Sequence, residues 1–233
     1  AELRSRTGVS LHQHSTGPML PLRSACWVAV LLTALSPRPS KKIGDRRHLA
    51  KIESTGLRRG ESMKETFQQY TARILGYLGS RDSVDVLRQT PGELTQLLER
   101  VGEAGLDFRP QPDKWSIRQH IAHMADVEIV LATRVRFATA EPGVALMPFD
   151  QDKWAITGKY EAAPLDQSLG AFIAVRRWNL GFFERLSPAD REGFGIHQER
   201  GRESFTYMVK LLAGHDLNHL RQVRERLAAS TAA

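Results

Sequence analysis

Beyond residue 63 the chain repeats apolar residues every three or four positions, which is the spacing that places them on one face of an α-helix. No stretch alternates apolar and polar residues for long enough to predict a β-strand. The pattern therefore predicts an all-α protein. The expected helices are a first one and a shorter second one, followed by three long ones: 63–79, 91–101, 117–140, 165–186 and 205–227.

Capping residues mark several of the expected helix ends. Thr90, followed by Pro91 and Glu93, has the pattern of a capping box at the start of the second helix, and residues 80–89 before it are interpreted as a separate short helical turn. Ser116 is the expected N-cap of the first long helix. The short and medium connections between the helices favour a four-helix bundle, in which a site forms between facing helices.

Residues 1–62 differ from the rest of the chain in pattern and in charge. They carry 11 Lys and Arg against 4 Asp and Glu, whereas residues 63–233 carry 22 of each sign. The segment mixes Arg, Ser, Gly and Pro without periodicity, which predicts a disordered or linker-like extension. An apolar run within 19–40 has the length of a signal-peptide core, but it lies far from residue 1 and no clear cleavage site follows it. A misassigned start, with Met63 as the natural one, and a targeting segment both stay open.

The distribution of charge decides between classes of partner. The net charge of +7 arises in residues 1–62, so the helical part offers no net positive charge for phosphates, and we expect no nucleic-acid partner. The single cysteine, Cys26, also lies in the extension, which excludes a cysteine-based zinc site in the helical part. We expect a cytoplasmic protein without a membrane span, exported only if the 19–40 segment is a real signal peptide.

Two histidines, His215 and His219, lie four positions apart within the apolar stripe of the last expected helix. Residues i and i+4 share one helix face, so both imidazoles can reach one ion. On its own, such a pair is better explained as buried side chains bonded to carbonyl or carboxylate groups. His120 and His123 lie on the first long helix, and a histidine from there would complete a three-nitrogen site with open positions, the pattern of catalytic metals.

Other catalytic patterns fit the sequence less well. The segment HDLNH at 215–219 resembles the H-E-x-x-H motif of zinc proteases, but Asp216 is one methylene shorter than the glutamate base of that motif, and no strand is predicted beside it. A Ser-His-Asp triad is not indicated, because the sequence contains no nucleophile-elbow motif. Di-iron bundles need Glu-x-x-His motifs, and none occurs in residues 63–233.

Two segments resemble helices of a known family, the DinB-like (DinB/YfiT) superfamily of metalloenzymes. Residues 113–128, DKWSIRQHIAHMADVE, are similar to its W-S-x-x-x-x-x-x-H-x-x-D-x-E helix, and residues 201–223, GRESFTYMVKLLAGHDLNHLRQV, are similar to its terminal H-x-x-x-H-x-x-Q helix. The likeness spans about residues 63–228. It implies that residues 63–233 form a four-helix, metal-binding domain.

The resemblance also implies a metal site and a type of chemistry. Carried over to this sequence, the ligands are His123, His215 and His219, usually for zinc, nickel or another divalent ion, and His120 is interpreted as a neighbour of a ligand or a surface residue. Family members include thiol-dependent S-transferases. The implied function is a metal-dependent small-molecule enzyme, a transferase or hydrolase, with a low-molecular-weight thiol as a further cofactor. A non-catalytic metal-binding or metal-sensing bundle is the alternative.

Further residues are assigned supporting roles near the site. His197 is a candidate for its rim, and Arg134 and Arg176 fit either an acidic substrate or a surface salt bridge. A small-molecule substrate and a homodimer are expected. Four polar residues are candidates to orient the imidazoles through their second nitrogen: Asp126, Glu128, Asp216 and Gln222.

Overall fold

The computed structural model describes residues 65–232, and the predictions made for residues 1–62 lie outside the described residues. The elements follow one another in the order α1 (Phe67–Leu78), α2 (Ser83–Leu98), α3 (Glu103–Asp107), α4 (Ile117–Ala140), β1 (Val144–Leu146), α5 (Gln151–Thr157), η1 (Tyr160–Ala162), α6 (Leu165–Arg185), η2 (Asp190–Glu192), β2 (Phe194–His197), β3 (Gly201–Ser204) and α7 (Phe205–Ala232). Within residues 65–232, no helix combines the length and apolar character that a bilayer span requires.

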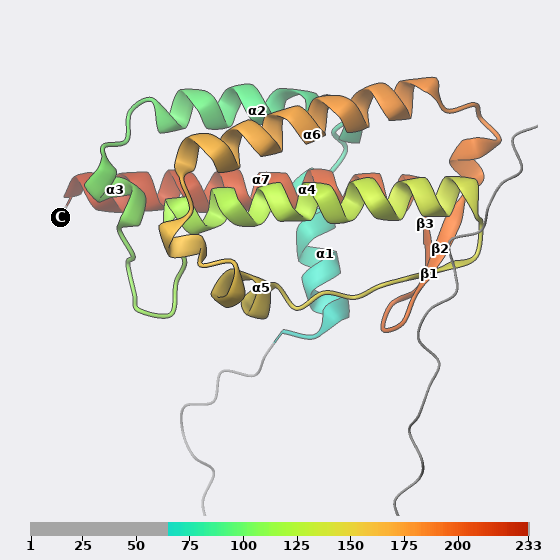
Figure 1. Cartoon of the computed structure of the whole chain (residues 1–233), viewed down its shortest axis with the longest axis horizontal. Coiled ribbons are helices and arrows are strands. Elements are labelled where there is room, and N and C mark those ends of the chain that lie inside the picture. Colours follow the sequence, from blue (N-terminus) through green and yellow to red (C-terminus); the bar gives the residue numbers. More distant parts are fainter. Residues whose placement is uncertain (1–64, 233) are drawn as a thin grey trace, which may run out of the picture. The chain divides into compact units, whose positions relative to one another are not determined.

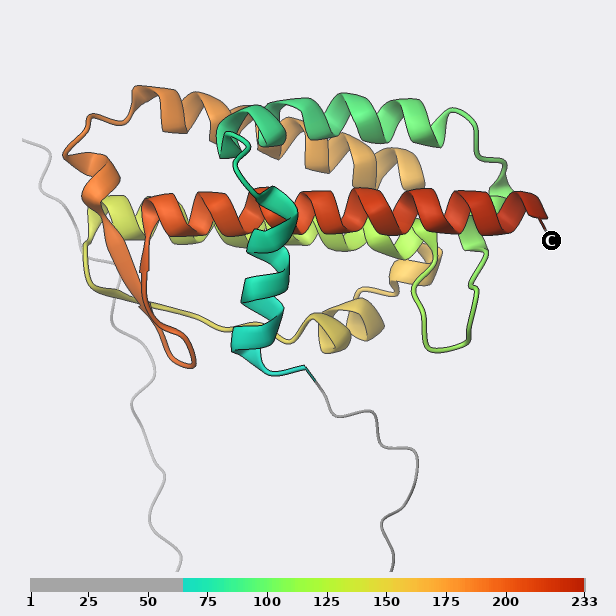
Figure 2. The same cartoon turned by 180° about the vertical axis from the view of Figure 1, so that it is seen from behind.

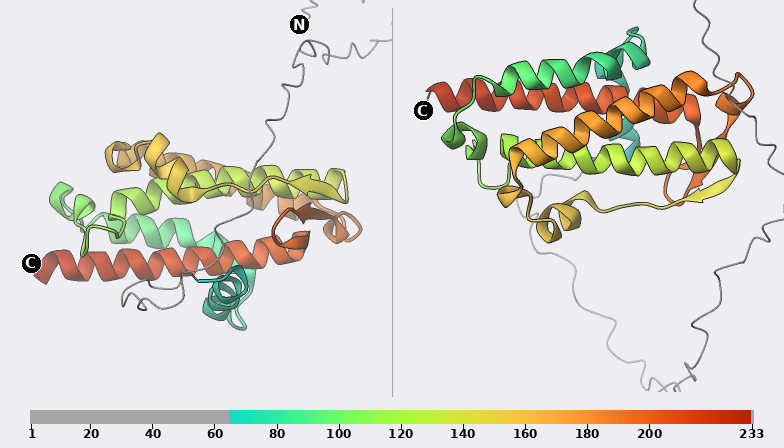
Figure 3. Two further views of the ribbon diagram at one scale, coloured as in Figure 1. Left: turned by 90° about the horizontal axis from the view of Figure 1, so that it is seen from below. Right: turned by 45° about the horizontal axis from the view of Figure 1, so that its top comes forward.

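Helices α2, α4, α6 and α7 run side by side and form the bundle (Figures 1 and 3). Helix α7 packs against α2 and α4, and α6 packs against the same two helices, so that each bundle helix has two neighbours. Helix α1 lies across α7 instead of along it (Figure 2). The predicted all-α four-helix bundle is confirmed, with α1 as an addition to it.

The interior of the bundle holds two apolar clusters with polar residues between them. One cluster includes Leu131 of α4 and Leu212 of α7, and the other includes Ile121 of α4 and Leu220 of α7. Buried polar groups have to be paired, so this polar layer concentrates the groups that are candidates for function. Its members are buried on α4, α6 and α7, and all but His123 lie between the two clusters along their helix: His123, Glu128, Arg176, Asn179, His215, Asp216 and His219.

A three-stranded sheet lies at one end of the bundle (Figure 1). Strand β2 pairs with β1 in parallel and with β3 in antiparallel orientation. The strands were not predicted, because each has only three or four residues and alternation is recognisable only over a longer run. Strand β3 leads directly into α7, where the Ser204 hydroxyl accepts a hydrogen bond from the backbone N–H of Tyr207 at 3.2 Å.

Helix α2 begins earlier than predicted. The side chain of Asp82 caps it by accepting a hydrogen bond from the backbone N–H of Asp85, so the expected short turn and the expected second helix are one element. The prediction of Thr90 as an N-cap is wrong, because its hydroxyl donates to the carbonyl of Val86 within the helix.

Pro91 consequently lies in the interior of α2. A proline has no N–H to donate to the carbonyl four residues earlier, which here is the carbonyl of Leu87. That carbonyl accepts a hydrogen bond from Arg176 of α6 at 2.9 Å instead. A tertiary contact thus replaces the missing bond of the helix.

Gly214 allows α1 to cross α7 at close range. A Cβ atom at this position would lie 2.2 Å from the backbone oxygen of Ile74, far inside van der Waals contact. The absence of a side chain therefore sets the distance between the two helices, one residue before His215. Since α1 lines the pocket described below, this glycine also places one wall of the site.

Candidate metal centre

Three histidines of the polar layer meet where α4 faces α7. His123 lies on α4, and His215 and His219 lie one turn apart on α7. Nε2 of His215 lies 3.1 Å from Nε2 of His123 and 2.9 Å from Nε2 of His219. All three side chains are buried, and one nitrogen from each lies within 4.8 Å of the others. The structure thus brings together the three residues that the resemblance implies as ligands.

The three Nε2 atoms cannot all be hydrogen-bonded to one another. An imidazole nitrogen carries either one lone pair or one proton, so Nε2 of His215 can satisfy one neighbour at most. The second contact then has no lone pair or proton of its own at this nitrogen. A cation shared by three lone pairs removes this conflict. Tetrahedral nitrogen ligands at about 2.0–2.1 Å from zinc lie about 3.3 Å apart, close to the separations in this cluster.

Burial keeps these imidazoles neutral. It lowers the pKa of His215 to about 3, with smaller contributions from Arg176 and His120, and it lowers the pKa values of His123 and His219 well below the ordinary value. A neutral imidazole has a free lone pair, which is the form that a metal binds. The cluster can therefore bind a cation at neutral pH without first losing protons.

His120 contacts the cluster without joining it. It is buried, which excludes the surface interpretation, and its Nδ1 lies 3.0 Å from Nδ1 of His219. A His219 that binds metal through Nε2 carries its proton on Nδ1 and can donate it to His120. Trp115 lies edge-on to His120 and His123, with ring centroids 5.7 and 4.9 Å apart, and its packing holds both rings in place.

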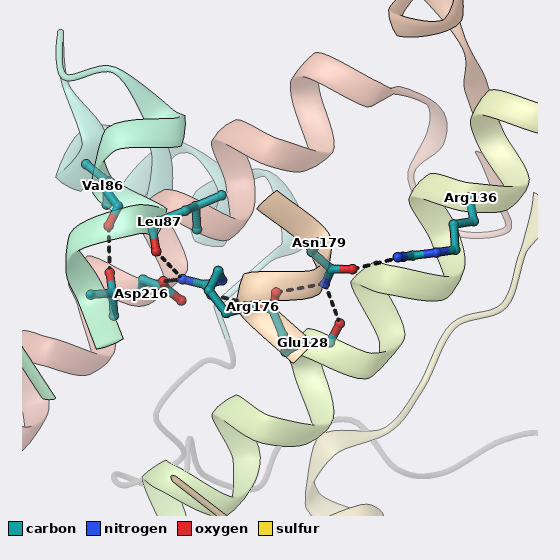
Figure 4. Close-up of polar contacts among 8 residues, drawn as sticks. Val86, Leu87, Glu128, Arg136, Arg176, Asn179 and Asp216 are labelled. Carbon is teal, nitrogen blue, oxygen red and sulfur yellow. Dashed lines mark hydrogen bonds and ion pairs between the residues drawn. The ribbon is translucent and has the colours of Figure 1, made fainter. Parts of the chain in front are cut away.

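Arg176 organises the other part of the polar layer (Figure 4). Its guanidinium donates to Asp216 and to Glu128, both at 2.7 Å, and the side chain of Asn179 donates to Glu128 at 2.8 Å. Burial alone would lower the pKa of Arg176, but the charges of Asp216 and Glu128 raise it. Arg176 is only 1% exposed, so the expectation of a surface salt bridge is wrong.

This pairing corrects the roles predicted for Glu128 and Asp216. Both carboxylates are bonded to Arg176 and not to an imidazole, because α6 supplies a buried cation that needs them. Burial raises the pKa of Asp216, and Arg176 partly offsets the rise. The zinc-protease interpretation is excluded as well, because the carboxylate that would act as the base, that of Asp216, is buried and paired with Arg176.

The other predicted site residues also have partners elsewhere. Asp126 accepts a hydrogen bond from the hydroxyl of Tyr160, and the side-chain oxygen of Gln222 accepts one from the amide of Asn218 at 3.4 Å. His197, predicted at the rim, is buried in β2 and accepts a backbone N–H at Nδ1. None of these bonds joins the residue to an imidazole of the histidine cluster.

A pocket of about 300 Å³ opens beside the histidines, and His123 and His215 line part of it. Its walls come from α1, α4 and α7. The turn between β2 and β3, together with β3, adds Arg200 and Glu203. Sequence reasoning missed this pair, because the hairpin that carries it was not predicted and neither residue belongs to a motif. The pocket leaves the side of the cluster formed by His123 and His215 accessible.

Residues 87–223 match the family model of the DinB superfamily. The match covers more than half of the chain and includes all three histidines of the cluster. The chain belongs to the DinB superfamily. The resemblance that rested on two sequence segments is thereby confirmed.

Several proteins similar to this DinB-superfamily chain are described as hydrolases. A protein of Bacillus mycoides (strain KBAB4) is 25% identical over 147 residues, which cover 62% of this chain and 84% of that protein. A protein of Oceanobacillus iheyensis is 26% identical over 140 residues, which cover 60% and 81%. Both carry the name "putative metal-dependent hydrolase".

Among solved structures, YfiT from Bacillus subtilis has a similar fold. It is described as "a probable metal-dependent hydrolase with an unusual four-helix bundle topology". The TM-score is 0.60 at 18% identity, and the match covers 75% of this chain and 94% of that chain. At this identity the likeness shows a shared fold, which agrees with the four bundle helices.

Proposed function

We propose that this DinB-superfamily protein binds one divalent metal ion through Nε2 of His123, His215 and His219 and uses it to hydrolyse a small organic substrate. The observation that carries the proposal is the meeting of three Nε2 atoms at 2.9 and 3.1 Å, around a nitrogen that can satisfy only one of its two neighbours. The names of the relatives support the same class of reaction.

A divalent ion on three imidazoles has open positions, lowers the pKa of bound water and polarises a carbonyl group. The chain's own residues provide the surroundings for this chemistry. His120 accepts the Nδ1 proton of His219 and so keeps Nε2 free as a ligand. The pocket brings the substrate to the side of the cluster formed by His123 and His215. Zinc and nickel both suit three imidazole ligands.

Two observations rank the possible reactions. The pocket of about 300 Å³ is at the lower end of the range for ligand sites, about 300–1,000 Å³. This favours one organic substrate with water over transfer to a low-molecular-weight thiol, which requires two organic molecules at the site. An open pocket beside the ligands also favours an enzyme over a bundle in which the ion only joins helices, because structural sites are closed.

The first test is metal content, measured by elemental analysis on the full chain without an affinity tag. We expect about one zinc or nickel ion per chain in the wild type and loss of the ion in His123→Ala, His215→Ala and His219→Ala. His197→Ala is the matched control, because it removes a buried histidine outside the cluster and should keep the ion. A wild type that stays metal-free after incubation with zinc and nickel contradicts the proposal.

The second test is the reaction itself. Metal-loaded protein is assayed with a panel of 4-nitrophenyl esters, with and without added thiol. Hydrolysis that needs no thiol and disappears in His215→Ala supports the proposal. Turnover only in the presence of a thiol replaces it with S-transfer, and a metal-loaded protein without turnover favours the non-catalytic bundle.

A further inference from the structure

Arg134 has no carboxylate partner within the described part of the chain, although it lines the pocket. The other cation of the lining, Arg200, is paired with Glu203, with Nη2 2.9 Å from Oε2. Arg134 donates to the backbone carbonyl of Met147, and its guanidinium carbon lies 5.8 Å from the centroid of the Phe149 ring. Its Nε–H group is buried and, among the described residues, has no acceptor.

The surroundings of Arg134 lower the pKa of its guanidinium but leave it charged at neutral pH. Burial and the nearby charge of Arg200 lower the pKa of Arg134 to about 10, and Glu203 offsets only part of the change. Arg134 is therefore still charged at neutral pH. The side chain of Arg134 as a whole is half-buried, but its Nε–H group is withdrawn from water, and a buried donor is normally hydrogen-bonded. The missing partner of Arg134 is expected to arrive with a ligand.

We propose that Arg134 binds a carboxylate of the substrate at the end of the pocket opposite the histidine cluster. This inference rests on the proposed function, because it places the reacting group of the substrate at the histidines. A guanidinium offers a carboxylate two parallel N–H donors. The lining carries two arginines and one glutamate, a net charge of +1, which matches a singly charged anion.

Helix α4 sets the length of such a substrate. His123 and Arg134 are eleven residues apart, a span of about 16 Å along the axis at about 1.5 Å per residue. Both side chains lean towards the N-terminus of the helix, and the longer arginine side chain reaches further in that direction, so the guanidinium lies closer to the imidazole than the axial span suggests. Val127 and Leu131 line the pocket between the two ends. A fitting substrate is elongated, with a hydrolysable ester or amide, an apolar middle and a terminal carboxylate.

Binding of octanoate and octanamide to the full chain tests the inference. The two probes have equal length and differ in charge, and EDTA is added so that the carboxylate cannot bind an ion. In isothermal titration calorimetry we expect the wild type to prefer octanoate by about tenfold or more. Arg134→Gln should lose the preference, and Arg134→Lys, which keeps the charge without the planar fork, should retain part of it.

Arg136→Gln is the matched control, because Arg136 lies on the same helix but bonds to Asn179 at 2.8 Å and does not line the pocket. It should keep the preference of the wild type. Circular dichroism verifies that each variant is folded. Equal affinity of the wild type for both probes, binding of neither, or an unchanged preference in Arg134→Gln overturns the inference.

Zinc-loaded protein provides a second readout with two esters of suberic acid. One is the mono-4-nitrophenyl ester with a free carboxylate, and the other has that carboxylate methylated; in both, water adds to the nitrophenyl ester and 4-nitrophenol leaves. Arg134→Gln should raise KM for the free acid about tenfold or more, with little change in kcat and no change for the methyl ester. Failure of the proposed hydrolase function can be told apart from failure of the inference about Arg134. If only the proposed function fails, neither ester is hydrolysed, but the wild type still prefers octanoate to octanamide.

Discussion

Replacement of Arg176 by methionine should remove most of what stabilises the polar layer. The variant leaves Glu128 and Asp216, each 1% exposed, without a cation, and it leaves the carbonyl of Leu87 without its side-chain donor. Removing one partner of a buried ion pair costs about 3–5 kcal/mol, and an orphaned buried acceptor costs about 1–3 kcal/mol. Because these contributions overlap, we expect the free energy of unfolding to fall by about 4–6 kcal/mol.

The proline of α2 allows one part of this loss to be isolated. In Pro91→Ala, residue 91 regains an N–H that can bond to the carbonyl of Leu87 within the helix. Arg176→Met should therefore cost about 1–2 kcal/mol less in the Pro91→Ala background than in the wild type. The difference is the coupling energy of a double-mutant cycle, in which the losses at Glu128 and Asp216 cancel.

The assay is urea unfolding of the four proteins of the cycle, followed by circular dichroism, with EDTA present so that metal binding does not contribute. Gly92→Ala replaces Pro91→Ala in a matched control cycle. A Cβ at Gly92 meets no atom within 4 Å, so this change also raises helix propensity but supplies no donor to Leu87. The control cycle should be additive within about 0.5 kcal/mol.

Two results would refute this reasoning. The first is a cycle with Pro91→Ala that is as additive as the control cycle. The contribution of the Arg176–Leu87 hydrogen bond to the free energy of unfolding would then not depend on the missing N–H of Pro91. If Arg176→Met costs less than about 1 kcal/mol, the carboxylates of Glu128 and Asp216 do not depend on the guanidinium, and the polar layer is held together in another way.

Two further predictions follow from packing and burial. Gly214→Ala should lower the free energy of unfolding by about 1–3 kcal/mol in urea titrations, the usual cost of overpacking, because its Cβ would lie 2.2 Å from the oxygen of Ile74; an unchanged midpoint would show that α1 moves away without cost. Burial lowers the pKa of His120 and His215 to about 3, so the unfolded chain takes up protons below about pH 6.5 that the folded, metal-free chain does not. Stability is therefore greatest above that pH and should fall by about 1.4 kcal/mol per such histidine on acidification to pH 5.5. In His215→Phe the loss of stability between pH 7.5 and 5.5 should be smaller by about 1.4 kcal/mol. Unfolding curves of the wild type that coincide at the two pH values would contradict the claim that these histidines stay neutral in the folded chain.

The long helices and the shared face of His215 and His219 could be predicted because their signals are local. Ser116 at the start of α4 accepts a hydrogen bond from the backbone N–H of Gln119, and the Gln119 side chain accepts one from Ser116, the capping box that defines a helix start. The i, i+4 spacing places His215 and His219 on one face whatever else the chain does. Only the third histidine, His123, needed the family resemblance, since no local pattern relates α4 to α7.

The pocket could not be predicted, because it is made by segments whose relation is purely tertiary. Arg200 lies in a turn between two strands too short to be recognised, and Tyr70 reaches the pocket only because α1 crosses α7 at a glycine. The prediction that a helix begins at Pro91 is wrong for a related reason. A proline normally favours the first turn of a helix, and its place in the interior of α2 is tolerated because Arg176, 85 positions further along the chain, supplies a donor.

Asp216 shows most directly where local reasoning stops. In sequence it stands between the two proposed ligands of α7, which predicts that it orients one of their imidazoles. Successive residues of an α-helix are rotated by about 100°, so when His215 faces His123 on α4, Asp216 points to a different neighbour. That neighbour is Arg176 of α6, at 2.7 Å. One turn of α7 thus presents imidazoles to one helix and a counter-charge to another, and only the bundle's arrangement tells which residue serves which purpose.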